Sequence, residues 1–168
     1  MNDSMLPAEP RRPRVWVADD VALEGEAARR ILSVAYDIEL FSDGSAVLER
    51  ASTGELPDLL VLDWHMPGVS GIEVCRFLRA SPDSVGVPIL VFTSTGDEQD
   101  MLESLAAGAD DYVGKAASAQ ELLARARSLT SSAASRRSAL SARSRSSLER
   151  TSEPARASSS CALAAFPT

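Results

Sequence analysis

Residues 59–68 read LLVLDWHMPG, a run of four large apolar residues that ends in an aspartate and a Pro-Gly turn. An uninterrupted apolar run of this length is typical of a strand that is buried on both faces of a parallel sheet. Beyond the turn, Ser70 is followed three residues later by Glu73, which is the capping-box pattern of a helix N-terminus. The stretch therefore predicts a buried strand that ends at Asp63 and leads through a short loop into a helix.

The same alternation extends in both directions from this stretch. Further short strands are predicted at residues 15–18, 37–41, 88–92 and 111–113, and amphipathic helices between and after them, the last over 119–129. About five strand–helix repeats in this order predict a parallel sheet with helices on both faces. Cys75 falls in an apolar helical pattern and is predicted to be a core residue. For Trp64, core packing and an exposed partner contact remain alternatives.

Polar residues with related chemistry follow the predicted strands, and in such folds ligands bind at the carboxyl ends of the strands. The residues at these ends are Asp19, Asp20, Asp63, Thr93 and Lys115. Converging carboxylates repel one another, and a hard divalent cation with oxygen ligands, Mg²⁺ or Mn²⁺, is the usual remedy. A lysine and a hydroxyl beside such a cation suit a phosphate oxygen, so the set indicates phosphoryl transfer.

Four motifs in this order make the chain similar to the receiver domains of two-component signalling. They are the acidic pair 19–20, the DWHMPG loop 63–68, Thr93-Ser94 and the segment 111–115. The resemblance covers about residues 14–130. It implies a flavodoxin-like (βα)5 doubly wound parallel sheet with strand order 2-1-3-4-5. It also implies a phosphoprotein of a phosphorelay, which takes its phosphoryl group from the phospho-His of a sensor histidine kinase or from a phosphotransfer protein.

The resemblance assigns a metal-binding role to several of these residues. Asp63 resembles the phosphoacceptor, and Asp19 and Asp20 resemble the acidic pair that holds Mg²⁺, with Asp20 expected to touch the ion directly. The backbone carbonyl of His65 is expected to supply a further ligand. His65 is the only histidine, so a cluster of histidine ligands is not available.

Other residues are expected to sense the phosphoryl group. By resemblance, Lys115 pairs with a phosphoryl oxygen, Thr93 shifts towards it, and Tyr112 is the aromatic switch that then turns inward. The surface from about Asp97 through Tyr112 to the last helix is expected to change, and in the family this surface often forms a homodimer or docks a partner. One departure is Ala116, where the family has proline and often a cis bond. A cis bond before a non-proline costs roughly 2.5–4 kcal/mol, so either a strained cis bond or a redirected Lys115 is expected.

Three functions are compatible with these residues. The first is a phosphorylatable switch that is not an enzyme apart from Mg²⁺-dependent self-phosphorylation and autodephosphorylation. The second is an interaction module that works without phosphorylation. The third is an aspartyl-phosphate phosphatase, which is disfavoured because such enzymes need a second acid two residues after the nucleophile, where this chain has His65.

Charge divides the chain into two parts. Residues 1–130 carry 11 basic and 22 acidic residues, a net charge of −11, whereas residues 131–168 carry six arginines and two glutamates, a net charge of +4. The acidic body argues against direct nucleic-acid binding by the body. There is no apolar run long enough for a membrane span and no signal peptide pattern, so the expected location is cytoplasmic.

The two ends of the chain differ from the body in composition. Residues 1–13 contain three prolines and are predicted to be a flexible leader to the receiver domain at 14–130. In residues 131–168, Ser, Ala and Arg make up 27 of 38 residues. This tail is predicted to be disordered or partly helical, with a helical extension as far as Leu148 as the main alternative to disorder.

Overall fold

The computed structural model describes residues 11–94 and 98–151, with side chains through residue 140. Within this part, strands and helices alternate strictly along the chain. The strands are β1 (Arg14–Ala18), β2 (Asp37–Phe41), β3 (Leu59–Leu62), β4 (Ile89–Thr93) and β5 (Asp111–Gly114). The helices are α1 (Ala22–Leu32), α2 (Gly44–Ser52), α3 (Gly71–Ala80), α4 (Glu98–Ala106) and α5 (Ala119–Thr151).

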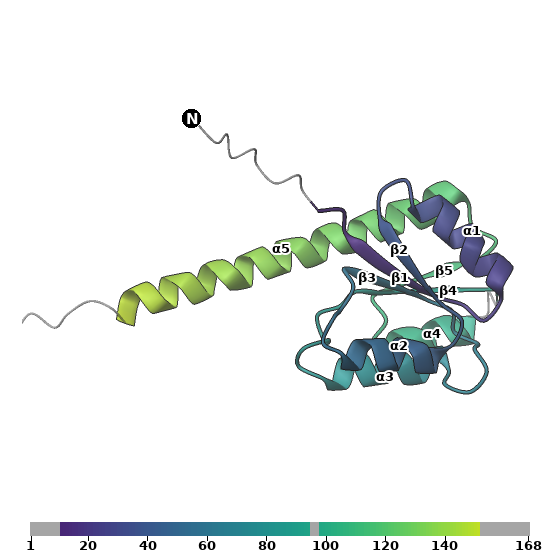
Figure 1. Ribbon diagram of the computed structural model, residues 1–168, viewed down its shortest axis with the longest axis horizontal. Helices are drawn as coiled ribbons and strands as arrows, with labels where there is room; N and C mark the ends of the chain where they lie inside the picture. Colours follow the sequence, from purple (N-terminus) through teal and green to yellow (C-terminus); the bar gives the residue numbers. More distant parts are fainter. Residues whose placement is uncertain (1–10, 95–97, 152–168) are drawn as a thin grey trace, which may run out of the picture. The chain divides into compact units, whose positions relative to one another are not determined.

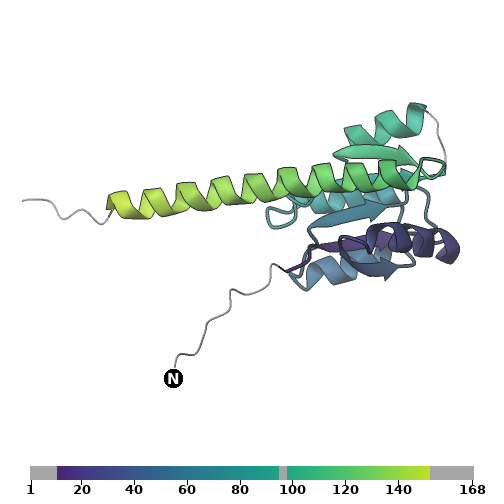
Figure 2. The same ribbon diagram turned by 90° about the horizontal axis from the view of Figure 1, so that it is seen from above.

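The five strands form one parallel sheet in the order β2-β1-β3-β4-β5. This confirms the predicted flavodoxin-like topology. Helix α1 and the first part of α5, up to Ser135, cover one face of the sheet, and α2, α3 and α4 cover the other (Figure 1; Figure 2 gives the view from above). The residue ranges predicted for the strands match the observed ones to within one residue.

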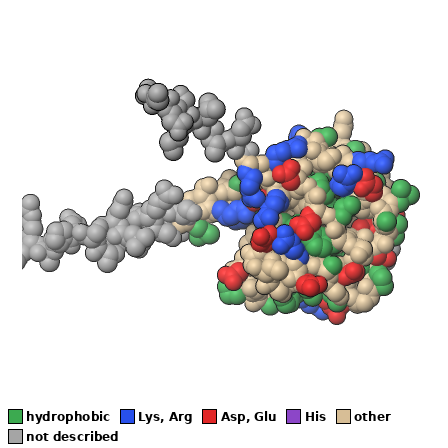
Figure 3. Space-filling model, in the orientation of Figure 1, with side chains coloured by type: hydrophobic (Ala, Val, Ile, Leu, Met, Phe, Trp, Pro, Cys, Tyr) green, Lys and Arg blue, Asp and Glu red, His purple; other side chains and the backbone are tan. Residues whose placement is uncertain are grey.

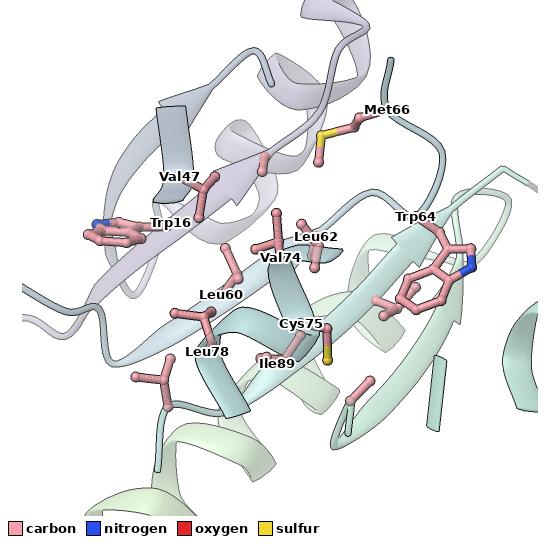
Figure 4. Close-up of a cluster of buried hydrophobic side chains, with 14 residues drawn as sticks. Trp16, Val47, Leu60, Leu62, Trp64, Met66, Val74, Cys75, Leu78 and Ile89 are labelled. Carbon is pink, nitrogen blue, oxygen red and sulfur yellow. The ribbon is translucent and has the colours of Figure 1, made fainter. Parts of the chain in front are cut away.

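Alternate residues of each inner strand fill two separate cores. Leu60 and Leu62 of β3 point into the core beneath α2 and α3, whereas Leu59 and Val61 point into the core beneath α1 and α5. Both faces of β3 are therefore apolar, which explains its continuous apolar sequence. Figure 4 shows the first of these cores, in which Cys75 is buried as predicted.

The loop after β3 is held on both of its sides. Trp64 is 4% exposed and packs in the core under α2 and α3, so it is a core residue and not an exposed contact (Figure 4). At the start of α3, the Glu73 carboxylate accepts hydrogen bonds from the backbone N–H of Ser70 (2.9 Å) and from its hydroxyl (2.8 Å). The predicted capping box is thus confirmed.

The tail differs from the preferred prediction of disorder. Helix α5 continues without a break through residues 131–151, so over this range the helical alternative is correct. Alanine and arginine are both strong helix formers, which favours this extension although few large apolar side chains are present. By its contacts the chain divides into two compact units, one ending at Ser135 and one beginning at Arg136. Residues 152–168 of the predicted tail lie outside the described residues.

Near the start of β1, arginines are paired with acidic side chains. Arg11 lies 3.2 Å from Asp58, and Arg50 lies 2.7 Å from Glu55. On the face shown in Figure 3, blue and red side chains are accordingly interspersed. Residues 1–10 of the predicted leader lie outside the described residues, whereas Arg11 already contacts the body.

In the described part of the chain, no helix combines the length and apolar character needed to cross a membrane.

Candidate functional site

The carboxyl ends of the inner strands bring three of the predicted residues into contact. Asp19 follows β1, Asp63 follows β3, and Lys115 follows β5. The backbone N–H of Asp63 donates to the carbonyl of Ala18 (2.8 Å), which extends the ladder between β1 and β3 by one step beyond the strands. The sheet itself therefore sets the distance between the two aspartates, and both residues are buried.

Lys115 lies between the carboxylates. Its Nζ is 2.7 Å from Oδ2 of Asp19 and 2.8 Å from Oδ2 of Asp63. The backbone N–H of Lys115 donates to the carbonyl of Thr93 (2.8 Å), which fixes the start of this loop against β4. The lysine side chain is only 10% exposed, so its ion pairs are largely shielded from water.

The pKa values of the two buried partners reflect different balances of burial and charge. Burial raises the pKa of Asp19 above its usual value, and the hydrogen bond from Lys115 only partly opposes this effect. Burial alone would lower the pKa of Lys115, but hydrogen bonds to Asp19, Asp63 and Glu24 outweigh it and raise the pKa above the ordinary value. Lys115 faces three opposite charges, which favour its charged form and raise its pKa. Asp19 faces one lysine and the like charge of Asp63, so burial remains the larger effect and raises the pKa of Asp19 as well.

A third carboxylate at the site was not predicted from the sequence. Glu24, in the first turn of α1, forms an ion pair with Lys115. Carboxylate oxygens of Asp19, Glu24 and Asp63 lie within 4.8 Å of one another. The only sequence signal was an acidic residue five positions after Asp19, and acids are common in first helical turns because of the helix dipole.

Asp20 lies elsewhere. Its side chain is exposed, and it does not belong to the group of carboxylates that the described residues form around Lys115. Its role as a metal ligand stays a prediction, as does that of the His65 carbonyl. Asp19 and Asp63 nevertheless offer the hard oxygen donors that Mg²⁺ and Mn²⁺ prefer, so the residues present fit such an ion.

His65 connects the loop after β3 with α4. Its backbone N–H donates to Oδ1 of Asp63 (3.3 Å). Its imidazole Nε2 lies 2.9 Å from Oδ2 of Asp100, in the first turn of α4. The ring therefore contacts a neighbouring helix at the edge of the site.

The two predicted switch residues lie on adjacent strands. Thr93 is fully buried at the end of β4, and it is the register partner of Gly114 on β5. Tyr112 of β5 is half-buried against the core under α3. Their proposed movement stays a prediction. Asp97, the expected start of the switch surface, lies outside the described residues, and α4 begins at Glu98.

The Lys115–Ala116 bond is trans, since the described residues contain no cis peptide bond. Of the two alternatives for this departure, the strained cis bond is therefore absent. The other alternative was that a trans loop redirects Lys115. The Nζ of Lys115 still reaches Asp63, so the loss of proline does not move the lysine away from the site.

Comparison with known proteins agrees with this geometry. The response regulator receiver domain family matches residues 15–127. The chain belongs to this family. It is thus a response regulator receiver domain of a two-component system.

Individual relatives point in the same direction. The chain is 51% identical over 113 residues to the phosphate regulon transcriptional regulatory protein PhoB of Rhizobium meliloti (strain 1021), covering 67% of this chain and 49% of that protein. It is 44% identical over 117 residues to the response regulator MprA of Mycobacterium ulcerans (strain Agy99), covering 69% and 49%. The chain therefore spans about half the length of these curated relatives.

Among solved structures, a putative response regulator from Chloroflexus aurantiacus J-10-fl superimposes with a TM-score of 0.69 at 28% identity. The match covers 72% of this chain and 99% of that chain. The receiver domain thus corresponds to nearly the whole of that structure.

Proposed function

We propose that this receiver domain accepts a phosphoryl group on Asp63 from the phospho-His of a sensor histidine kinase or a phosphotransfer protein. The observation that supports this is the position of Asp63, which is buried at the end of β3 with Lys115 Nζ 2.8 Å from its carboxylate. A carboxylate held beside a positive point charge is arranged to attack an electron-poor phosphorus while the charge on the transferred group is balanced.

In the proposed step, a carboxylate oxygen of Asp63 forms a bond to phosphorus as the P–N bond to the donor histidine breaks. The electron pair of that bond leaves on the imidazole. Lys115 then pairs with an oxygen of the phosphoryl group, and the Thr93 hydroxyl donates to another. A Mg²⁺ or Mn²⁺ ion held by Asp19, Asp20, Asp63 and the His65 carbonyl would neutralise charge on these oxygens.

The signal then passes to the surface of α4, β5 and α5. Phosphorylation adds about −1.5 to −2 charges, and movement of Thr93 towards the new group makes room for Tyr112 to turn inward. The contact between His65 and Asp100 gives the phosphoacceptor loop a direct link to α4. The outcome is a changed surface for a homodimer or another protein partner, with no turnover of a substrate beyond self-phosphorylation and autodephosphorylation.

An interaction module that is never phosphorylated is the competing function. Its main support was the absence of proline after Lys115. Because Lys115 still contacts both Asp19 and Asp63, the site retains the charge arrangement that the reaction needs. The phosphorylatable switch is therefore the better-supported function.

The test is labelling by a small phosphoryl donor such as acetyl phosphate in the presence of Mg²⁺. One acid-stable, base-labile phosphoryl group should appear on the wild-type protein by intact mass spectrometry, as expected for an acyl phosphate. Asp63→Asn should abolish it, because the attacking oxygen is lost. Asp83→Asn, which removes an exposed aspartate away from the strand ends, should label normally. Normal labelling of Asp63→Asn would overturn the assignment.

A further inference from the structure

Glu24 gives the site an acidic side chain beyond those of the aspartates. It lies in the first turn of α1 and forms an ion pair with Lys115 from the solvent side, where its own side chain is 40% exposed. The other two partners of the lysine, Asp19 and Asp63, have side chains that are 2% and 6% exposed. The lysine thus has two enclosed partners and one that water can reach.

All hydrogen-bonding capacity of Lys115 is used by these three carboxylates. An ammonium group has three N–H donors and no acceptor, and its Nζ donates to or pairs with Asp19, Asp63 and Glu24. Phosphorylation frees one of these donors, because the Asp63 carboxylate loses its charge when it forms the acyl phosphate. A second contact between the dianionic phosphoryl group and the lysine forms only if another carboxylate gives up its own contact. Which carboxylate does so determines how strongly the new group is held.

The enclosed partners are each held by a second contact. Oδ1 of Asp19 accepts a hydrogen bond from the backbone N–H of Val21 (2.9 Å), and Oδ1 of Asp63 accepts one from the backbone N–H of His65 (3.3 Å). Releasing Asp19 from Lys115 leaves an unpaired carboxylate in a buried site, which is costly. Asp63 carries no carboxylate charge once it is phosphorylated, so the choice lies between Asp19 and Glu24. Releasing Glu24 costs less, because its carboxylate can turn into water.

We infer that Glu24 is a positioning residue that competes with the phosphoryl group for Lys115 and so weakens the hold of the site on that group. The inference rests on the proposed phosphorylation of Asp63. Glu24 also adds one negative charge where a dianionic group must be accommodated, and both effects act in the same direction. Glu24 thereby shifts the equilibrium of the receiver towards the unphosphorylated state.

The matched pair of variants is Glu24→Gln and Glu26→Gln. Both remove one negative charge from α1, so the net charge of the two proteins is the same. Glu26 pairs with Arg29 (2.6 Å) and not with the site, so only Glu24→Gln removes a competitor of the phosphoryl group. Because the Glu24 pair is partly exposed, its removal should change binding of a phosphoryl mimic by about two- to fivefold.

Lys115 is the only lysine in the sequence, which gives a single reporter of its surroundings. Protein grown with [ε-¹³C]lysine should show one side-chain NMR signal. In the absence of ligand, this signal should shift in Glu24→Gln and stay in place in Glu26→Gln. A signal unaffected by Glu24→Gln would mean that the contact does not exist in solution and would overturn the inference.

The closing experiment titrates beryllium fluoride, a phosphoryl mimic, into each protein at saturating Mg²⁺ while following this signal. Glu24→Gln should bind about two- to fivefold more tightly than Glu26→Gln, a gain that mere structural damage does not produce. Equal affinities would overturn the competition. So would a fall in Mg²⁺ affinity of more than about tenfold in Glu24→Gln alone, since Glu24 would then act as a metal ligand. If the wild-type protein does not bind the mimic, the proposed function itself fails, and the inference fails with it.

Discussion

Lys115 is the residue on which the site depends, and the chain uses lysine nowhere else among its 17 basic residues. A compact ammonium group can face carboxylates that arrive from three different elements, whereas the planar guanidinium of arginine suits paired contacts in one plane. The pKa of Lys115 is raised, so its pairing stabilises the folded protein throughout the neutral range. That contribution is fully present below the ordinary lysine pKa of 10.5 and is lost only as the pH rises through the higher folded value.

Replacing this lysine should therefore destabilise the metal-free protein. Lys115→Met keeps the length of the side chain but leaves Asp19 and Asp63 close together without a cation, which should lower the free energy of unfolding by about 2 kcal/mol. Urea unfolding in EDTA measures the loss, and millimolar Mg²⁺ should restore part of it by supplying another cation. Arg76→Met, the same charge change at an exposed position of α3, should alter stability by less than about 0.5 kcal/mol. Equal stability of Lys115→Met and the wild-type protein in EDTA would contradict this account.

The sequence predicted the site residues that follow strands, but it did not predict Glu24, which lies on a helix. Asp19, Asp63 and Lys115 could be found because parallel strands end at one edge, whatever the details of packing. Glu24 could not, because the rotation of α1 about its axis depends on how it packs on the sheet. The open alternatives for Trp64 had the same cause, since a residue next to a polar site can turn either way.

At the scale of elements, the junction between β3 and α3 positions the phosphoacceptor. The first residue of α3, Gly71, lies so close to the end of β3 that a Cβ built on it would be 2.4 Å from the carbonyl oxygen of Asp63 and 2.9 Å from Cα of Trp64. Its N–H also donates to the carbonyl of Trp64 (3.1 Å). The helix can approach the strand this closely only because residue 71 has no side chain.

Gly71→Ala should disturb both stability and the site. The methyl group must push α3 away from the backbone of Asp63, a strain of about 1–3 kcal/mol in a packed environment. Urea unfolding should show that loss, and acetyl phosphate should label the variant more slowly because the Asp63 carboxylate is displaced. Gly86→Ala is the matched control, since a Cβ at Gly86 meets nothing within 4 Å. If the two variants label at the same rate, the close approach at Gly71 does not matter for the site.

Most of the helices and strands were predictable from the sequence. The exception is the last part of α5, and it has a physical reason. Strands such as β3 are marked by apolar runs that no exposed segment would carry. The continuation of α5 beyond Thr130 has no such mark, because residues 131–151 contain mainly serine, alanine and arginine. Their composition predicts little burial, and disorder was expected on that ground. Helix propensity acts independently of burial, and alanine and arginine supply it.

For the molecule as a whole, the remaining question is where the folded body ends. The sequence placed its limit at residue 130, and the family match ends at residue 127. The structure gives a compact unit that ends at Ser135, within which Ala133 is only 2% exposed. The hydroxyls of Thr130 and Tyr36 lie 3.1 Å apart, so α5 is still attached to the body at that position. Small side chains such as Ala133 give too weak a pattern for a sequence to reveal this last turn.

Two truncated chains should show whether the folded body ends at residue 130 or at residue 135. A chain ending at Ser135 should unfold within about 0.5 kcal/mol of the full-length protein, because the Ser-, Ala- and Arg-rich segment beyond it has few apolar groups to bury. A chain ending at Thr130 should be less stable by about 1 kcal/mol, since it loses the buried methyl group of Ala133 and frays the end of α5. Urea unfolding of the three proteins under one condition gives both differences. A loss already complete in the chain ending at Ser135 would mean that residues beyond 135 stabilise the body, and equal stability of all three would place its limit at residue 130, as the sequence predicted.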